Sequence, residues 1–333
     1  MGPILLSSSG CSGVVRERVS PPGGSALTDR TCTVIYIAGY GRSGSTVLDI
    51  LLNQHPDVLS GGEVGQLYRW LRAGETCACR VPIRECSFWR AVCAEHAAGS
   101  VDDPPRTESF QRSIESLRNL PALLLSLNRK DRQEAYRRQM RSLFGSLAHV
   151  SGKRWIVDSS KSTRPYMGRA LALERYAGLD VRAIHLVRDP CGVGWSAMRG
   201  EGSPEWERLV HRPRARFGRA LASWTMTNAL TCMTARHLRR GALRVRYEDL
   251  CAAPGTVLER IGEFVGLDMS AVIRTMEHGE RLRVGHNVGG NRVRFHSRLM
   301  FRPDEEWREK LPGAYRRAAR IATWPVRRGL GYP

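Results

Sequence analysis

Lysine is scarce in this chain of 333 residues, although its net charge is +20. Only Lys130, Lys153, Lys161 and Lys310 occur, so nearly all of the 52 lysine and arginine residues are arginine. Such a charge is typical of nucleic-acid-binding proteins. The arginines are spread along the whole chain, however, and no zinc-finger, helix-turn-helix or RNA-binding signature accompanies them. We therefore expect no nucleic-acid partner and keep an arginine-rich nucleic-acid binder as a distant alternative.

Long apolar runs are also absent. No stretch of the sequence approaches the ~20 apolar residues that a membrane-spanning helix needs, so we expect no transmembrane segment. Residues 1–30 are rich in Ser, Gly and Pro and lack a basic leader followed by an apolar core, which argues against a signal peptide. We predict a disordered tail over residues 1–30, one domain over residues 31–330, and a cytoplasmic location.

The cysteines lack the paired C-x2-C spacing of common zinc sites. Cys77, Cys79 and Cys86 are followed by Cys93 and His96, which gives the pattern C-x-C-x6-C-x6-C. Because two C-x2-C knuckles are missing, a folded loop with free cysteines is the expectation and a zinc site is the alternative. We expect no metal.

Residues 33–52 are predicted to form a strand, a glycine-rich turn and a helix. An apolar, β-branched run of strand length leads into a turn with three glycines, and a mostly apolar helix follows. Glycines let backbone N–H groups converge on an anion, and the helix N-terminus adds partial positive charge. A guanidinium and three hydroxyl groups complete a predicted phosphate site made of Arg42, Ser43, Gly44, Ser45 and Thr46.

This loop differs from the Walker A loop of kinases and GTPases, G-x-x-x-x-G-K-[ST]. Gly39, Gly44 and Thr46 have the right spacing, but Ser45 stands where the lysine belongs. The cation is Arg42, inside the loop. Magnesium-dependent chemistry on ATP is therefore disfavoured, and a P-loop kinase remains the alternative function.

Two further predicted strands end in a charged residue. Residues 58–64 form a short apolar run with a Gly-Gly turn that presents Glu63, and residues 155–162 bring Lys161 to the end of another strand. Functional groups gather at the carboxyl ends of strands in an open parallel sheet. Glu63 is therefore a candidate general base, although a structural ion pair is the commoner role for such a residue. Lys161 is a candidate for neutralising a transferred group.

The run at 181–187 is nearly continuously apolar, as in a buried parallel strand. It ends in Arg188, and Ser196 follows eight residues later in the next helix. These two side chains are placed to grip a second phosphate from two sides. A further strand is predicted over residues 243–250. Because strands alternate with helices, we expect an α/β fold with a central, mostly parallel, doubly wound sheet.

Two segments are expected to complete the site. Residues 66–150 contain apolar residues at helical spacing and are predicted to be a helical insertion that lines the acceptor side. Near the end of the chain, Gly289 and Gly290 precede a basic stretch and form a loop able to close over a phosphate. Its candidate phosphate ligands are Asn291, Arg292 and Arg294.

Together these residues resemble the sulfotransferase family that uses 3′-phosphoadenosine 5′-phosphosulfate (PAPS). The loop Gly41–Thr46 looks like the family's 5′-phosphosulfate loop, in the arginine form of bacterial and Golgi-type members. Arg188 and Ser196 match its 3′-phosphate pair, and the segment 290–294 looks like the late cofactor loop of bacterial members. The resemblance covers residues 33–295.

The resemblance also implies catalytic roles. Glu63 lies 21 residues after Arg42, as the catalytic glutamate does in protein-tyrosine sulfotransferases, and Lys161 lies where such enzymes place a lysine near the sulfuryl group. The chain departs from the cytosolic type, which has a lysine in the loop and a histidine base. The implied function is sulfuryl transfer from PAPS, without a metal, to a hydroxyl of a small molecule, glycan, lipid or tyrosine. Glu63, Lys161 and Arg42 are the expected catalytic residues.

Overall fold

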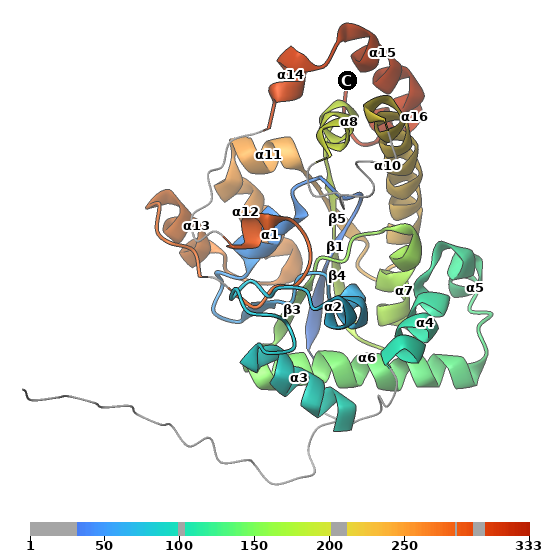
Figure 1. Cartoon of the computed structure of the whole chain (residues 1–333), viewed down its shortest axis with the longest axis vertical. Helices are drawn as coiled ribbons and strands as arrows, with labels where there is room; N and C mark the ends of the chain where they lie inside the picture. Colours follow the sequence, from blue (N-terminus) through green and yellow to red (C-terminus); the bar gives the residue numbers. More distant parts are fainter. Residues whose placement is uncertain (1–31, 99–103, 201–211, 284, 296–303) are drawn as a thin grey trace, which may run out of the picture.

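The computed structural model describes residues 32–98, 104–200, 212–283, 285–295 and 304–333 (Figure 1). The predicted tail over residues 1–30 lies outside these ranges. None of the helices in the described part of the chain combines the length and the hydropathy that crossing a bilayer requires.

Five strands form the central sheet, in the order β2-β3-β1-β4-β5. All four pairings between neighbouring strands are parallel. The predicted α/β class with a mostly parallel sheet is thus confirmed. The strands are β1 (Thr33–Ala38), β2 (Val58–Ser60), β3 (Trp155–Asp158), β4 (Asp180–Val187) and β5 (Ala242–Arg246).

Helices cover both faces of the sheet (Figure 1), so the central strand β1 is buried on both sides. Successive side chains of a strand point to opposite faces. Val34 and Tyr36 belong to the apolar cluster that includes residues of α3 (Ser87–Ala98) and α6 (Lys130–Ser151). Ile35 and Ile37 belong to the cluster that includes residues of α1 (Ser45–Leu52) and α12 (Pro254–Val265). Because both faces of this central strand are buried, its sequence is a nearly continuous apolar run and not an alternation of apolar and polar residues.

The helices that surround the sheet follow the chain in the order seen in Figure 1. They are α1 (Ser45–Leu52), α2 (Leu67–Ala73), α3 (Ser87–Ala98), α4 (Pro104–Glu115), α5 (Leu120–Leu124), α6 (Lys130–Ser151), α7 (Arg169–Arg175), α8 (Pro190–Arg199), α10 (Pro213–Ala235), α11 (Tyr247–Ala252), α12 (Pro254–Val265), α13 (Ser270–Glu277), α14 (Glu306–Lys310), α15 (Gly313–Ala322) and α16 (Trp324–Gly329).

The connection between β2 and β3 is the long helical segment that the sequence predicted over residues 66–150. It contains α2 to α6, and α3 packs against α6. Its role in lining the acceptor side stays a prediction.

The strand predicted over residues 243–250 is too long. β5 ends at Arg246, and α11 begins at Tyr247. Glu248 and Asp249 lie in the first turn of this helix, where negative charge is stabilised by the helix dipole. Glu248 also accepts hydrogen bonds from the Asp189 N–H (2.9 Å) and the Tyr332 hydroxyl (2.7 Å), which fixes the turn to α8 and the chain end.

Candidate active site

The predicted site residues lie at the carboxyl ends of the strands. β1 runs into the glycine-rich loop 39–44, β2 is followed by Glu63, β3 by Lys161, and β4 by Arg188. In a parallel sheet these ends share one edge, which is where open α/β sheets bind ligands.

The loop 39–44 needs glycine at two positions for steric reasons. Gly39 has φ 111°, and a Cβ there would lie 2.3 Å from the carbonyl oxygen of Leu186 in β4. Gly44 has φ 88°, and a Cβ there would lie 2.5 Å from the ring of Tyr247. The loop is therefore pressed between the end of β4 and the start of α11, and a side chain at either glycine would displace it.

The N-terminus of α1 offers unused hydrogen-bond donors to an anion. Its N-cap residue is Gly44, which has no side chain to cap the helix, and the first turn carries no acidic residue. The buried hydroxyl of Ser43 has no hydrogen-bond partner among the described residues. Because the first N–H groups of a helix lack partners within the helix, these groups fit a phosphate.

Arg42 and Arg188 meet at this loop. The Arg42 guanidinium donates to the backbone oxygen and to the hydroxyl of Ser196, both at 3.2 Å. The Arg188 guanidinium donates to the carbonyl oxygen of Arg42 at 3.1 Å. The structure thus brings the loop, the end of β4 and helix α8 together, as we expected from the sequence.

Tyr247 and Asp304 hold the guanidinium of Arg188, which sequence reasoning missed. The ring of Tyr247 lies 4.5 Å below the guanidinium, in a cation–π arrangement. Asp304 pairs with Arg188 through its carboxylate (3.1 Å) and accepts a hydrogen bond at its backbone oxygen (2.8 Å). A phosphate bound by Arg188 would therefore compete with Asp304.

A small basic cavity adjoins this cluster. It has a volume of about 110 Å³ and lies between the loop, α8 and α10. Arg216 and Arg219 of α10 line it together with Arg42. The two α10 arginines were not predicted, because an arginine on a helix surface carries no local signal of function.

Glu63 and Lys161 form an ion pair at the ends of β2 and β3. Gln66 donates a second hydrogen bond to the Glu63 carboxylate at 2.5 Å. The Lys161 side chain passes beside the loop, with its Cδ 3.9 Å from the position of a Cβ on Gly41. The predicted base and the predicted catalytic lysine therefore lie together, next to the predicted phosphate site.

Residues 287–294, called the late loop from here on, lie over Glu63 and Thr46. Val288 pairs with Gly62 as an isolated parallel bridge and accepts the N–H of Glu63 at 2.8 Å. The N–H of Asn291 donates to the Thr46 hydroxyl at 3.2 Å. Asn291 thus lies beside the glycine-rich loop, and its predicted role in binding a phosphate stays a prediction.

The two arginines of the late loop behave differently. Arg292 is exposed. Arg294 is buried, pairs with Glu75 at 2.5 Å and donates to the Thr76 carbonyl oxygen at 3.2 Å. These partners belong to the loop after α2, so Arg294 holds that loop, and its predicted phosphate role stays a prediction.

Asp49 is a buried carboxylate that the sequence analysis overlooked. It accepts hydrogen bonds from the hydroxyls of Ser60 and Ser159 and from the Asn287 amide. Burial raises its pKa to about 6. Asp49 joins α1, β2, the end of β3 and the late loop, and its only sequence signal is a charged residue within an apolar helix.

The cysteines at positions 77–86 have a different histidine neighbour from the one that lies near them in the sequence. Cys77, Cys79 and Cys86 gather with His286, whereas Cys93 is not part of this group. His96 lies between the Tyr68 hydroxyl (2.7 Å) and the Ser142 hydroxyl (2.8 Å).

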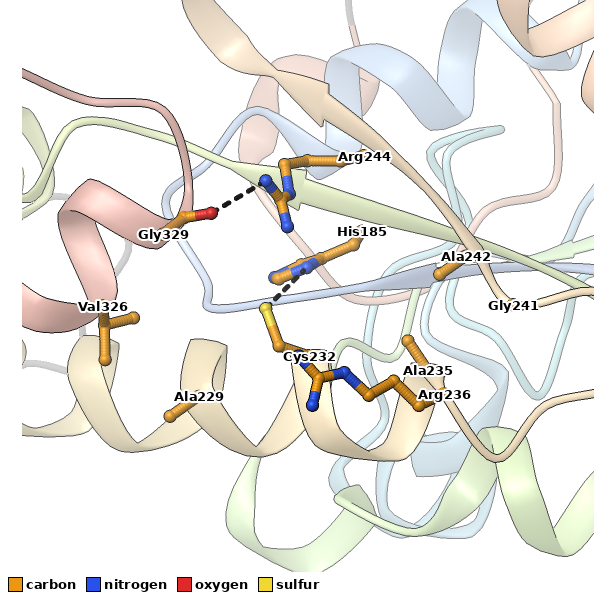
Figure 2. A pocket seen from close by; sticks show the side chains of 10 residues that line it. All are labelled: His185, Ala229, Cys232, Ala235, Arg236, Gly241, Ala242, Arg244, Val326 and Gly329. Carbon is orange, nitrogen blue, oxygen red and sulfur yellow. Dashed lines mark hydrogen bonds between the residues drawn. The ribbon is translucent and has the colours of Figure 1, made fainter.

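A larger cavity, shown in Figure 2, is lined by none of the predicted catalytic residues. Its volume is about 440 Å³, and it is lined by residues of β4, α10, β5 and α16 and of the turn before β5. His185 faces it but is held by Asn228 at 2.9 Å, and burial lowers its pKa to about 4. His185 is therefore a neutral structural histidine.

Comparisons with known proteins identify the family. The sequence model of the sulfotransferase family matches residues 35–271. Two solved structures share the fold. One is the sulfotransferase domain of the Synechococcus PCC 7002 olefin synthase (TM-score 0.52, 22% identity, 93% of this chain and 99% of that chain covered).

The other is the sulfotransferase domain of the curacin biosynthetic pathway (TM-score 0.55, 18% identity, 92% of this chain and 99% of that chain covered). No curated protein matches the sequence. The family match decides against the kinase alternative. This chain belongs to the sulfotransferase family and is a PAPS-dependent sulfotransferase.

Proposed function

We propose that this enzyme transfers a sulfuryl group from PAPS to a hydroxyl group of its acceptor, with Glu63 as the general base. The observation that carries the proposal is the position of the Glu63–Lys161 pair directly beside the phosphate loop. A base must reach the acceptor proton, and a cation must reach the charge that develops on the transferred group.

The residues of the loop are proposed to hold the 5′-phosphate of PAPS. The backbone N–H groups at the start of α1 and the hydroxyl groups of Ser43, Ser45 and Thr46 are the donors. Arg42 adds a full positive charge. The uncapped helix N-terminus and the unpartnered Ser43 hydroxyl support this assignment.

Arg188 and Ser196 are proposed to bind the 3′-phosphate. Their contacts with Arg42 place them within one side-chain length of the loop. A ligand with two phosphates is thus selected over one with a single chain of phosphates. Asn291 and Arg292 are proposed to close over the nucleotide from the late loop.

When bound, PAPS supplies the sulfuryl group and leaves as adenosine 3′,5′-bisphosphate. Glu63 accepts the proton that the acceptor hydroxyl loses as its oxygen bonds to sulfur. Lys161 and Arg42 would stabilise the negative charge that develops on the bridging oxygen as its bond to sulfur breaks and the oxygen stays with the 5′-phosphate. Since little covalent work falls to the protein, positioning and charge stabilisation supply most of the rate.

The acceptor is proposed to enter from the side of the helical segment 66–150. Glu63 directly precedes that segment, and Gln66 binds its carboxylate. The acceptor class is an alcohol, phenol, sugar or tyrosine hydroxyl.

An acceptor screen tests the proposal. Purified protein is incubated with isotope-labelled PAPS and a panel of hydroxyl compounds, and products are read by mass spectrometry. We expect a labelled sulfate ester from at least one acceptor class, formed ~10²–10⁴-fold more slowly by Glu63→Gln. Release of adenosine 3′,5′-bisphosphate without any esterified product would contradict transfer to a hydroxyl.

A further inference from the structure

Three cysteines and one histidine converge outside the catalytic machinery. Cys77, Cys79 and Cys86 belong to the loop between α2 and α3, and His286 belongs to the segment that leads into the late loop. About 200 residues of chain separate the two segments, so only the fold brings them together. The mechanism proposed above uses none of the four side chains.

The distances within this group are those of ligands around one small ion. The sulfur atoms of Cys79 and Cys86 are 3.6 Å apart. His286 Nδ1 lies 3.3 Å from the sulfur of Cys86 and 3.8 Å from the sulfur of Cys77. All four ligand atoms lie within 4.8 Å of one another.

A tetrahedral zinc site needs nearly this spacing. With Zn–S bonds of about 2.3 Å and a Zn–N bond of about 2.0 Å, the tetrahedral edges are roughly 3.8 Å between sulfurs and 3.5 Å between sulfur and nitrogen. A disulfide instead requires about 2.05 Å between its sulfurs. Cys77, Cys79 and Cys86 are free thiols in the structure.

The surrounding contacts orient the histidine and close the loop. The ring of Phe88 stacks on the imidazole of His286, with centroids 4.8 Å apart. Trp89 donates its indole N–H to the His286 carbonyl oxygen at 2.7 Å, and the N–H of Ala78 donates to the Asn287 carbonyl oxygen at 3.0 Å. Such contacts around the ligands fix their orientation in metal sites.

We propose that Cys77, Cys79, Cys86 and His286 bind one Zn²⁺ ion in a closed structural site. Three thiolates and an imidazole suit zinc, and four protein ligands leave no open position for catalysis. The three thiols lose their protons when the metal binds. This proposal replaces the sequence-based expectation that no metal is present. His286 takes the place that the spacing suggested for Cys93 and His96.

The metal fastens the late loop to the helical segment. Next to His286, Asn287 donates to the carboxylate of Asp49, and Val288 accepts the N–H of Glu63. A zinc ion at His286 therefore fixes the chain that leads over the active site. Its loss is expected to loosen this loop without removing a catalytic group.

Metal content tests the site. Full-length protein, purified without a histidine tag from zinc-supplemented medium, is measured by elemental analysis. We expect one zinc per chain in the wild type and in the control Cys93→Ser, and less than a tenth of that in Cys79→Ser and His286→Gln. A chelator should lower the melting temperature of the wild type but not that of Cys79→Ser.

A measurement on the wild type keeps the test valid if the variants misfold. Cobalt replaces zinc after chelation, and the absorption spectrum is recorded. We expect the intense visible bands of tetrahedral Co²⁺ and a near-ultraviolet thiolate-to-cobalt band. The proposal is overturned by folded wild-type protein that takes up no zinc, by a Cys79–Cys86 disulfide in its place, or by the weak spectrum of octahedral cobalt.

Discussion

Asp158 and Lys161 lie three residues apart at the end of β3, and each belongs to an ion-paired cluster of a different kind. Asp158 pairs with Arg169 at 2.7 Å, and Arg169 also pairs with Glu115 at 2.5 Å. The side chains of Asp158, Arg169 and Glu115 all have 0% exposure. Lys161 pairs with Glu63, and these two side chains are 12% and 10% exposed.

The carboxylates of the buried cluster are fully paired. Asp158 is also bound by Ser160, and Glu115 by the Tyr136 hydroxyl and the Gln111 amide, so every carboxylate oxygen has a donor. It joins α4, α6 and α7 to β3. The partly exposed pair lies beside the phosphate loop and the glycines of the late loop. Only three residues of chain therefore separate a charge network buried within the fold from the ion pair that we propose acts in catalysis.

Glu63→Gln should have the largest effect on turnover and should leave the buried cluster intact. Losing a general base lowers turnover ~10²–10⁴-fold. Because the amide keeps the shape of the side chain, binding of adenosine 3′,5′-bisphosphate should change little, and so should the melting temperature. Steady-state kinetics and calorimetric titration measure the two effects. Wild-type turnover in this variant would remove Glu63 from the mechanism.

Arg169→Met should break the buried cluster. Removing one partner of a buried ion pair costs about 3–5 kcal/mol, because the carboxylates are left without a counter-charge. Denaturant unfolding measures the change in the free energy of unfolding.

The control is Arg129→Met, which removes a pair whose arginine is 80% exposed. An exposed pair contributes only ~0–1 kcal/mol. If Arg169→Met and Arg129→Met lower the stability equally, the buried cluster does not hold the fold.

Lys161→Met should lower turnover by ~10²–10³, the usual loss when one preorganised charge-stabilising group is removed. Lys153→Met, at a lysine that is likewise half-buried and donates to the Pro56 carbonyl oxygen, is the matched control and should keep wild-type turnover. The double variant with Glu63→Gln should lose less than the product of the single losses, since the two groups act as a unit. Strictly multiplicative losses would argue that the two act independently.

Asp49 adds a pH dependence of stability. Its pKa is raised from 3.8 to about 6 by burial, so the folded state binds the proton more tightly than the unfolded state. Its stabilising contribution is therefore fully present below pH ~4 and is lost as the pH rises through ~6. At ~1.36 kcal/mol per pH unit, the loss is about 3 kcal/mol.

Urea unfolding of the wild type and of Asp49→Asn between pH 4 and pH 7 measures this contribution. The variant cannot titrate at this position, so the wild type should lose stability relative to it as the pH rises. Parallel stability curves would show that Asp49 keeps its ordinary pKa.

Much of the fold could be predicted from the sequence, because its signals are local. Glycine turns and apolar runs mark β1, β4 and the phosphate loop within a few residues. The end of β5 was missed because Tyr247 has strand propensity, whereas the contacts that hold Glu248 in the helix come from distant parts of the chain.

The candidate site was predictable mainly where a residue closely follows a strand or lies in a glycine-rich turn. Glu63, Lys161 and Arg188 have that signal. Asp49 lies within an apolar helix, and its partners come from three other segments. His286 joins Cys77 across 209 positions. Spacing in the sequence does not encode contacts of that range.

The central claim is that the loop and Arg188 bind the two phosphates of one nucleotide. Calorimetric affinities for adenosine 3′,5′-bisphosphate and adenosine 5′-monophosphate test it most directly, in the wild type, in Arg188→Ala and in the control Arg182→Ala on the same strand. A charge-assisted hydrogen bond is worth about 1.5–3 kcal/mol, or roughly 10- to 150-fold in affinity. We predict that the wild type and the control prefer the bisphosphate by such a factor and that Arg188→Ala loses this preference while its monophosphate affinity stays the same. An unchanged preference in Arg188→Ala would contradict the account.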